Sequence, residues 1–233
     1  MADDPVLLIT GASSGIGAAT ARAAAGKYRL VLAARRLEDL EALAAELGGQ
    51  ERAIAVRCDV TEWDEVQALA ATALERIGRI DAVFANAGFG ATRGFLEESP
   101  EHWRSMVLTN VYGVALTIRA TLPHLLKRGD GHFLITSSVA GRRALPGSLY
   151  SATKWAATAI GESLRQELRQ MHDNHGIRVT LIEPGMVDTA FFDNPVSNAL
   201  DPQDIARAVM YAVQQPAHVD VNEILVRPTA QDS

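Results

Sequence analysis

Short apolar runs alternate with longer helical patterns along this chain, and the alternation is the sequence feature that most restricts its fold. The apolar runs predict strands at residues 6–9, 30–32, 54–56, 82–84, 133–135, 179–182 and 224–226. They are apolar at consecutive positions, which is typical of strands covered on both faces in a parallel sheet. Because parallel strands need helical crossovers between them, we expect an α/β protein with a doubly wound, seven-stranded sheet flanked by helices.

The segments between the strands carry signals for the starts of helices. An apolar stripe at helical spacing covers residues 66–77, and Thr61 with Asp64 predicts a capping pair in front of it. Ser99 and Asp201 each stand directly before a proline, a pattern that predicts an N-cap followed by a first-turn proline.

Length, charge and cysteine content restrict the class of protein further. The 233 residues are 48% hydrophobic, which suits one domain over residues 1–233. The net charge of −6 gives no global attraction to nucleic acid or an anionic membrane, and no apolar run reaches the roughly 20 residues of a membrane span. Cys58 is the only cysteine and the six histidines are scattered, so we expect a cytoplasmic protein without disulfides or a metal site.

A glycine-rich turn follows the first predicted strand and opens an alanine-rich helix. A pyrophosphate has to approach backbone N–H groups at a helix N-terminus, where the helix dipole and unpaired donors favour an anion. Side chains at Gly11 or Gly15 would keep the ligand away, and Gly17 lets the helix pack closely on the strand. No Gly-Lys-Ser/Thr sequence follows, which excludes an ATP-type loop. The turn therefore predicts a dinucleotide site formed by Gly11, Ser13, Ser14, Gly15, Ile16 and Gly17.

Two arginines, Arg35 and Arg36, follow the second predicted strand, and the first acidic residue after them is Glu38. NAD-binding proteins place an acidic residue near this point to accept hydrogen bonds from the ribose hydroxyls, whereas a 2′-phosphate requires arginine. The pair therefore predicts NADP(H) as the cofactor. The alternative interpretation is that the arginines only form the solvated start of the next helix.

Tyr150 and Lys154 stand four residues apart, a spacing that places both on one face of a helix. A tyrosine titrates near pH 10, and a nearby ammonium favours the phenolate, which brings the hydroxyl toward the range of general acid–base catalysis. Ser138 follows the fifth predicted strand, where a hydroxyl points to the crevice in which such sheets bind ligands. There the hydroxyl can hydrogen-bond a substrate carbonyl, although a loop serine that caps the turn is the more common interpretation when either feature stands alone.

These motifs together resemble the short-chain dehydrogenase/reductase family. The resemblance runs in order through the glycine turn at residues 10–17, the Asn-Ala-Gly at 86–88, Asn110, Ser138, Tyr150 with Lys154, and the Pro-Gly at 184–185. It covers about residues 6–228 and implies a single-domain Rossmann fold. It also implies an NADP(H)-dependent oxidoreductase that interconverts a carbonyl and an alcohol by hydride transfer.

The resemblance implies roles for four residues at the reacting centre. Tyr150 would be the proton donor in carbonyl reduction and the base in alcohol oxidation, and Ser138 would polarise the carbonyl. Lys154 would hold the nicotinamide ribose hydroxyls and lower the pKa of Tyr150. Asn110 would hold a water in the proton relay.

The family also implies contacts to the remainder of the cofactor. Asp59 would contact the adenine, Asn86 would support the cofactor and the central sheet, and Thr189 would hold the carboxamide. The cofactor-binding residues implied after the second strand are Asp59, Val60, Asn86, Ala87, Gly88, Tyr150, Lys154, Pro184, Gly185, Val187 and Thr189.

Two departures from the family pattern leave alternatives open. The usual distance from catalytic serine to tyrosine is thirteen residues, which Ser137 would satisfy, whereas the Ser-x-Ala-Gly context favours Ser138 with a one-residue loop deletion. The ending over residues 221–229 lacks the glycines of many acyl-carrier-protein reductases. It looks like the branch of serine and 3-hydroxy acid dehydrogenases and clavulanate-type aldehyde reductases.

The substrate side is less specific in the sequence. A short lid is expected at about residues 190–200, with Phe191, Phe192, Met186 and Leu145 as apolar walls. Arg142 and Arg143 follow the catalytic serine, where a solvated loop is the main interpretation and a contact to a substrate carboxylate the alternative. No metal is expected at the site.

Other functions share some of these features. A 3-oxoacyl-acyl-carrier-protein reductase shares the chemistry, and a non-catalytic NADP-binding sensor would share the glycine turn. A sugar-nucleotide epimerase would need a substrate domain for which this chain is too short. By family, we expect a small-molecule substrate and a homodimer or homotetramer formed through helices at about residues 100–126 and 148–171.

Overall fold

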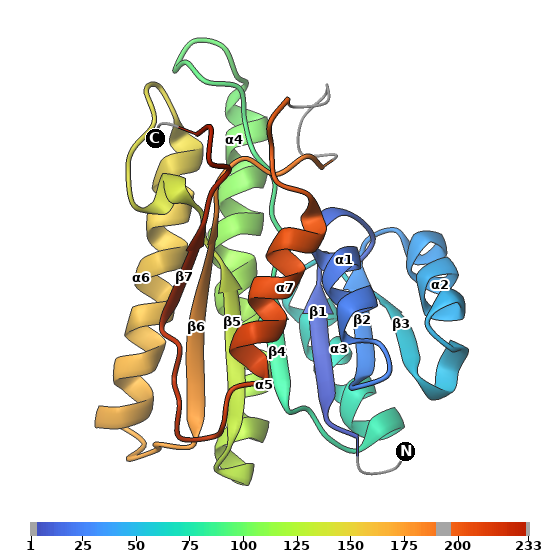
Figure 1. The fold of residues 1–233 in the computed structure, drawn as a ribbon. Coiled ribbons are helices and arrows are strands. Elements are labelled where there is room, and N and C mark those ends of the chain that lie inside the picture. Colours follow the sequence, from blue (N-terminus) through green and yellow to red (C-terminus); the bar gives the residue numbers. More distant parts are fainter. Residues whose placement is uncertain (1–3, 190–196, 232–233) are drawn as a thin grey trace.

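Seven parallel strands form one sheet in the order β3-β2-β1-β4-β5-β6-β7 (Figure 1). The computed structural model describes residues 4–189 and 197–231. The strands are β1 (Val6–Thr10), β2 (Arg29–Ala34), β3 (Ala53–Arg57), β4 (Ala82–Ala85), β5 (Gly131–Thr136), β6 (Ile177–Pro184) and β7 (Glu223–Val226). All seven predicted strands are confirmed, as are the doubly wound α/β class and the Rossmann topology.

Helices cover both faces of this sheet. They are α1 (Gly15–Ala24), α2 (Leu37–Glu46), α3 (Trp63–Ile77), α4 (Pro100–Val107), α5 (Gly113–Arg128), α6 (Leu149–Gln170) and α7 (Pro202–Val213). A π-helical turn, η2 (Leu108–Tyr112), joins α4 to α5, and short 3₁₀ turns lie at η1 (Gly49–Glu51) and η3 (Val139–Gly141). In Figure 1, α1 and α7 lie in front of the sheet, whereas α3 and α5 lie behind it.

The strands are buried on both faces because successive side chains enter two different cores. In β1, Val6 and Leu8 belong to the core shared with α3, α5 and α6, whereas Leu7 and Ile9 belong to the core shared with α1, α2 and α7. All four side chains are fully buried. This alternation across the sheet explains why the strands are apolar at every position.

Two of the three expected helix caps are confirmed. Ser99 accepts a hydrogen bond from the N–H of His102 (3.1 Å), and Asp201 accepts one from Gln203 (2.8 Å). The predicted cap of Thr61 and Asp64 is wrong. The N-cap position is occupied by Glu62, so α3 begins one residue later than expected and without a side-chain cap, and the Thr61 hydroxyl donates to the Asp59 carboxylate (2.8 Å).

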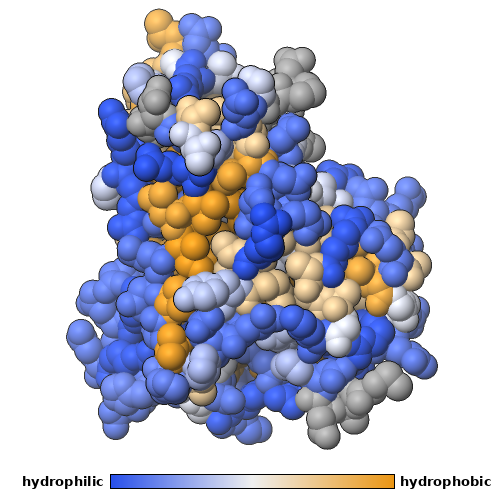
Figure 2. Space-filling model, in the orientation of Figure 1, coloured by the Kyte–Doolittle hydropathy of each residue, from blue (hydrophilic) through white to orange (hydrophobic). Residues whose placement is uncertain are grey.

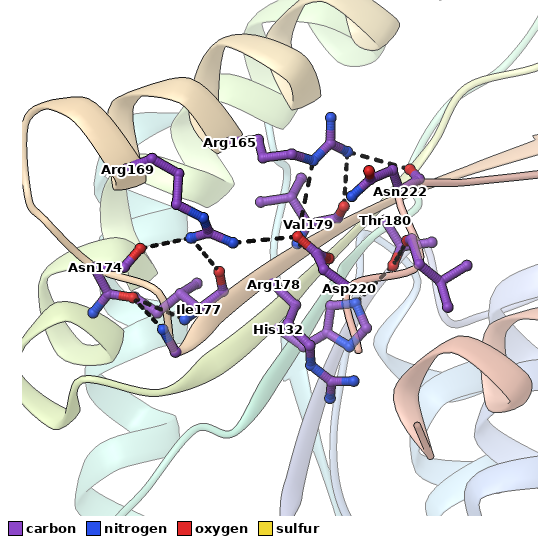
Figure 3. Close-up of polar contacts among 12 residues, drawn as sticks. His132, Arg165, Arg169, Asn174, Ile177, Arg178, Val179, Thr180, Asp220 and Asn222 are labelled. Carbon is purple, nitrogen blue, oxygen red and sulfur yellow. Dashed lines mark hydrogen bonds and ion pairs between the residues drawn. The ribbon is translucent and has the colours of Figure 1, made fainter. Parts of the chain in front are cut away.

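A polar network around Asp220 lies at the end of the sheet opposite the glycine turn (Figure 3). Asp220 accepts hydrogen bonds from Arg169 of α6 (3.3 Å) and from the N–H of Val179 in β6 (3.1 Å). The buried His132 of β5 lies 2.7 Å from the Thr180 hydroxyl, which donates to the carbonyl of Val221 (2.6 Å). These bonds fix the segment before β7 against β6, so the edge strand is set in register.

The viewed surface is mostly hydrophilic, with an apolar band between α6 and α7 over β6 and β7 (Figure 2). Leu225 of the edge strand β7 is 47% exposed. No helix in the described part of the chain is long and apolar enough to cross a membrane.

The order of the strands determines where a ligand can lie. From β1 the chain proceeds outward to β2 and β3, and it then returns to place β4 on the other side of β1. The connections that leave the carboxyl ends of the paired strands β1 and β4 therefore run in opposite directions, and a crevice opens between them at this point.

Candidate active site

A cleft of about 420 Å³ lies at the carboxyl ends of the strands and is formed by residues from across the chain. It gathers nearly all the catalytic and cofactor-binding residues predicted from the sequence. Gly17 and Asn110 are the exceptions and lie behind its wall. The predicted residues that line it are Gly11, Ser13, Ser14, Gly15, Ile16, Arg35, Arg36, Asp59, Val60, Asn86, Ala87, Gly88, Ser138, Tyr150, Lys154, Pro184, Gly185, Val187 and Thr189.

The glycine turn has the backbone of a ligand cradle at the start of α1. Gly11 and Gly15 adopt positive φ angles of 66° and 53°. A Cβ atom at Gly11 would lie 2.8 Å from the Cα of Ala87, and one at Gly17 would lie 2.3 Å from the carbonyl oxygen of Gly11. Side chains are therefore excluded here by the close approach of the turn, helix and β4 loop, and the N-terminus of α1 remains accessible to an anion.

Arg36 reaches from the end of β2 to the glycine turn. Its Nη2 atom donates to the hydroxyl of Ser13 (3.1 Å), while its Nε atom pairs with Asp39 of α2. Arg35 is exposed and also lines the cleft. The guanidinium of Arg36 thus lies in the wall of the cleft and also forms the exposed start of α2, and its role toward a 2′-phosphate stays a prediction.

Asn86 joins the ends of three strands. Its Nδ2 atom donates to the carbonyl of Thr10 at the end of β1 (3.2 Å), and its Oδ1 atom accepts from the hydroxyl of Thr136 at the end of β5 (3.0 Å). At the end of β3, Asp59 accepts from both the N–H and the hydroxyl of Thr61. These bonds fix the floor of the cleft.

The two candidate serines have different surroundings. The Ser138 hydroxyl is hydrogen-bonded to Tyr150, donates to the carbonyl of Pro184 (3.2 Å) and accepts from the N–H of Ala140 (3.1 Å). The Ser137 hydroxyl instead donates to the carbonyl of Lys154 (3.0 Å) and lies 2.7 Å from the hydroxyl of Thr158. Ser138 is therefore the serine that the structure brings to Tyr150.

Tyr150 and Lys154 lie one turn apart on α6, with the Lys154 Nζ atom 5.6 Å from the centre of the Tyr150 ring. Desolvation by the surrounding protein raises the pKa of Tyr150 to about 12, against a smaller lowering by the Ser138 hydrogen bond. Burial lowers the pKa of Lys154 to about 8. The expected lowering of the tyrosine pKa by Lys154 is thus not found among the protein groups, because desolvation dominates the shift and only the Ser138 hydrogen bond opposes it.

Asn110 occupies the π-helical turn η2 and is 1% exposed. Its amide accepts from the N–H of Phe89 (3.0 Å) and donates to the carbonyl of Phe89 (2.8 Å) and the hydroxyl of Thr153 (3.0 Å). The side chain therefore ties the loop after β4 to α6, directly behind the cleft. Its water-holding role stays a prediction.

Several residues of the cleft were not predicted from the sequence: Ala34, Cys58, Phe89, Thr109 and Thr136. The backbone carbonyl of Thr136 accepts a hydrogen bond from Lys154, and no side-chain motif predicts a contact of this kind. Phe89 directly follows the Asn-Ala-Gly motif, and this position was the available signal.

The expectations for the substrate side have mixed outcomes. Phe191 and Phe192 lie outside the described residues, together with most of the expected lid. Met186 and Leu145 are not among the described residues that line the cleft. Arg142 is exposed, as expected for the loop, but its guanidinium is also paired with Glu183 (2.7 Å) and with Glu223.

Comparison with known proteins identifies the family. The family model described as short chain dehydrogenase matches residues 5–199. An uncharacterized oxidoreductase of Staphylococcus saprophyticus is 40% identical over 98% of this chain and 97% of that protein. One from Listeria monocytogenes is 39% identical over 97% of each.

Three solved structures with the same fold are complexes with NADP, a derivative of it, or NAD. An alcohol dehydrogenase from Thermococcus sibiricus, complexed with 5-hydroxy-NADP, has a TM-score of 0.89 and 34% identity over 99% of both chains. A serine dehydrogenase complexed with NADP+ has a TM-score of 0.88 and 29% identity over 98% of this chain and 96% of that one. A short-chain dehydrogenase/reductase from Burkholderia phymatum, in complex with NAD, has a TM-score of 0.84 and 30% identity over 96% and 89%. The chain therefore belongs to the short-chain dehydrogenase family and is an oxidoreductase.

Proposed function

We propose that this oxidoreductase interconverts a carbonyl and an alcohol by hydride transfer with NADP(H), using Tyr150 as the proton-transfer group. The observation that carries the proposal is the hydrogen bond between Tyr150 and Ser138 in the same cleft as the glycine turn. The adjacent Lys154 amino group completes this arrangement on α6. Proton transfer and cofactor binding thus have their groups in one site.

The side chains divide the chemistry among them. When bound, the nicotinamide supplies or accepts the hydride. Tyr150 is protonated at neutral pH, since its pKa is raised to about 12, and it donates its proton to the developing alkoxide in reduction. Ser138 donates a hydrogen bond to the carbonyl oxygen, which stabilises the negative charge that develops there. Lys154 holds the nicotinamide ribose hydroxyls, and Asn110 holds a water of the proton relay.

The residues of the cleft fit a dinucleotide. Gly11, Ser13, Ser14, Gly15 and Ile16 form the turn that receives the pyrophosphate, where positive φ angles and excluded Cβ positions support the assignment. Gly17 keeps α1 close to this turn. The remaining contacts to the cofactor are assigned to Asp59, Val60, Asn86, Ala87, Gly88, Pro184, Gly185, Val187 and Thr189.

The preference for NADP(H) rests on Arg35 and Arg36. The bond from Arg36 to Ser13 supports a guanidinium beside the phosphate-binding turn, where a 2′-phosphate would be recognised. Asp39 pairs with the same guanidinium, which orients it from α2. Because the solved relatives bind either NADP or NAD, the preference of this protein for NADP(H) is assigned to the two arginines.

Small hydroxy compounds and the corresponding aldehydes or ketones are the proposed substrates. Similarity to an alcohol dehydrogenase and to a serine dehydrogenase supports this class. The test is titration with NADPH and NADH, followed by turnover with benzaldehyde, cyclohexanone, ethyl acetoacetate, 3-hydroxybutyrate and serine. Tighter NADPH binding with turnover of a panel compound is expected. Equal or tighter NADH binding would remove the roles of Arg35 and Arg36, and binding without turnover would favour a sensor.

A homodimer or homotetramer is proposed for the assembly. Val107 of α4, Tyr112 of η2 and Trp155 of α6 are exposed apolar or aromatic side chains on the helices expected to form the contact. Light scattering of the purified protein tests the proposal, and a monomer at micromolar concentration would contradict it.

A further inference from the structure

Glu183 is a buried carboxylate that the reaction chemistry does not use directly. It lies in β6, directly before Pro184, and is 1% exposed. Burial raises its pKa, and the hydrogen bond and charge of Arg142 act in the opposite direction. A buried carboxylate is costly unless it is paired, and the 2.7 Å bond from the Nε atom of Arg142 supplies the pairing.

The ion pair joins the turn that Ser138 caps to the end of β6. Ser138 caps the short turn η3, and Arg142 is the residue that ends this turn, with its N–H bonded to the carbonyl of Val139 (3.0 Å). Ser138 donates to the carbonyl of Pro184, and Arg142 pairs with the neighbouring Glu183. Two connections therefore span the same two segments, one made by the reacting serine and one by the ion pair.

The serine connection cannot persist through the proposed reaction. A hydroxyl has one hydrogen, and in the structure Ser138 donates it to the carbonyl of Pro184. To donate to a carbonyl substrate, Ser138 has to release Pro184. The ion pair of Arg142 and Glu183 then remains as the side-chain connection that holds the turn against the end of β6.

We propose that Arg142 and Glu183 are positioning residues, whose ion pair, in which the Glu183 carboxylate is buried and the Arg142 guanidinium is partly exposed, keeps the Ser138 hydroxyl in place while its hydrogen bond passes from Pro184 to the substrate carbonyl. This inference rests on the proposed carbonyl–alcohol function. Glu223 of β7 pairs with the same guanidinium but is 44% exposed, so water replaces its contribution readily. Glu183 is therefore the carboxylate that holds Arg142 and the turn of Ser138 in place, and Glu223 is the matched control.

The test compares Glu183→Gln with Glu223→Gln in wild-type and Ser138→Ala backgrounds. The assay measures kcat and KM for whichever compound of the panel above the wild type turns over fastest, with NADPH affinity by fluorescence and the thermal midpoint. Glu183→Gln is expected to lower kcat about 10- to 100-fold, as small misplacements of reacting groups do. KM and NADPH affinity stay within about twofold of wild type, since the cofactor contacts are unchanged. Glu223→Gln keeps kcat within about twofold.

The Ser138→Ala background separates positioning from general destabilisation. If the ion pair acts through Ser138, Glu183→Gln causes no further loss of kcat once the serine hydroxyl is absent. Arg142→Lys, which keeps the charge with a different geometry, is expected to recover part of the activity lost in Arg142→Ala. Losses that multiply in the double variant, or equal losses in Glu183→Gln and Glu223→Gln, would overturn the inference alone. Absence of turnover by the wild type on the whole panel would overturn the proposed function and this inference with it.

Discussion

Lys154 donates a hydrogen bond from Nζ to the carbonyl oxygen of Thr136, the last residue of β5, over 2.9 Å. The side chain is only 5% exposed, and burial lowers its pKa to about 8. The backbone of the sheet thus holds the amino group beside Tyr150. Its charged form is present below about pH 8 and is lost above that value.

The first prediction concerns the pH dependence of activity that follows from the lowered pKa of Lys154. If the charged Lys154 is needed to hold the ribose hydroxyls, kcat/KM for NADPH falls as the pH rises through about 8. Lys154→Arg keeps its charge across this range and is expected to be slower but flat up to about pH 10. The pH profiles of both proteins check this, and the same decline in both would assign it to another group.

The strands of the sheet could be predicted from the sequence because each strand is marked by a short apolar run of its own. Each strand is apolar at consecutive positions, and the buried Leu7 and Leu8 show why, since they enter different cores. The position of the cleft could also be predicted, because the carboxyl ends of parallel strands all lie at the same end of the sheet. Residues at strand ends, such as Asp59 and Asn86, were therefore predictable as neighbours.

Long-range contacts account for what could not be predicted. The Ser-x-Ala-Gly context favoured Ser138, but the spacing alone favoured Ser137, because the choice depends on which hydroxyl faces Tyr150. The pairing of Arg142 joins residues 41 positions apart and has no sequence motif. The cap expected at Thr61 is absent because Glu62, one residue later, is the N-cap residue of α3, and the Thr61 hydroxyl is bonded to Asp59.

Arg36 provides the second prediction. A hydrogen bond to a charged group contributes about 1.5–3 kcal/mol, so Arg36→Ala should weaken NADPH binding by about 10- to 100-fold. NADH, which lacks the 2′-phosphate, should bind with unchanged affinity. Fluorescence titration with both cofactors checks this. Arg76→Ala, at an exposed arginine bonded to Gln50, serves as the control. A parallel loss for NADPH and NADH would contradict the phosphate role.

Gly17 provides the third prediction through its packing. Its Cβ position lies 2.3 Å from the carbonyl oxygen of Gly11 and 2.9 Å from Nδ2 of Asn86. Gly17→Ala therefore forces the turn and Asn86 apart, and it should lower the free energy of unfolding by about 1–3 kcal/mol. NADPH affinity should fall with it, because the phosphate turn moves.

Gly26→Ala is the matched control for this variant. Gly26 has a φ of 79°, but its Cβ position has no heavy atom within 4 Å. It should lose about 1–2 kcal/mol of stability from backbone strain and keep its NADPH affinity. Urea unfolding and NADPH titration distinguish the two, and equal NADPH affinities would show that the turn tolerates a methyl group.

His132 provides the fourth prediction, on acid stability. Burial lowers its pKa to about 3, whereas an unfolded histidine titrates near 6.5. Below pH 6.5 the unfolded chain binds a proton that the folded chain does not, so stability falls as the pH falls. Between pH 6.5 and pH 5 the loss is about 2 kcal/mol.

A His132→Gln variant isolates this contribution. Glutamine does not titrate, so the variant should lose less stability than the wild type between pH 7 and pH 5, even if it is less stable at pH 7. Urea unfolding at both pH values measures the difference. An identical pH dependence in the two proteins would show that His132 does not set the acid limit.

The most direct test of the proposed reaction is the Tyr150→Phe variant, assayed for NADPH binding and for NADPH-dependent reduction of the best panel compound. The change removes the hydroxyl bonded to Ser138 and leaves the ring and the glycine turn. We expect NADPH affinity within about twofold of wild type and turnover lower by about 10²- to 10⁴-fold, the range of general acid–base catalysis. Turnover close to that of the wild type would contradict the assignment of Tyr150 as the proton-transfer group.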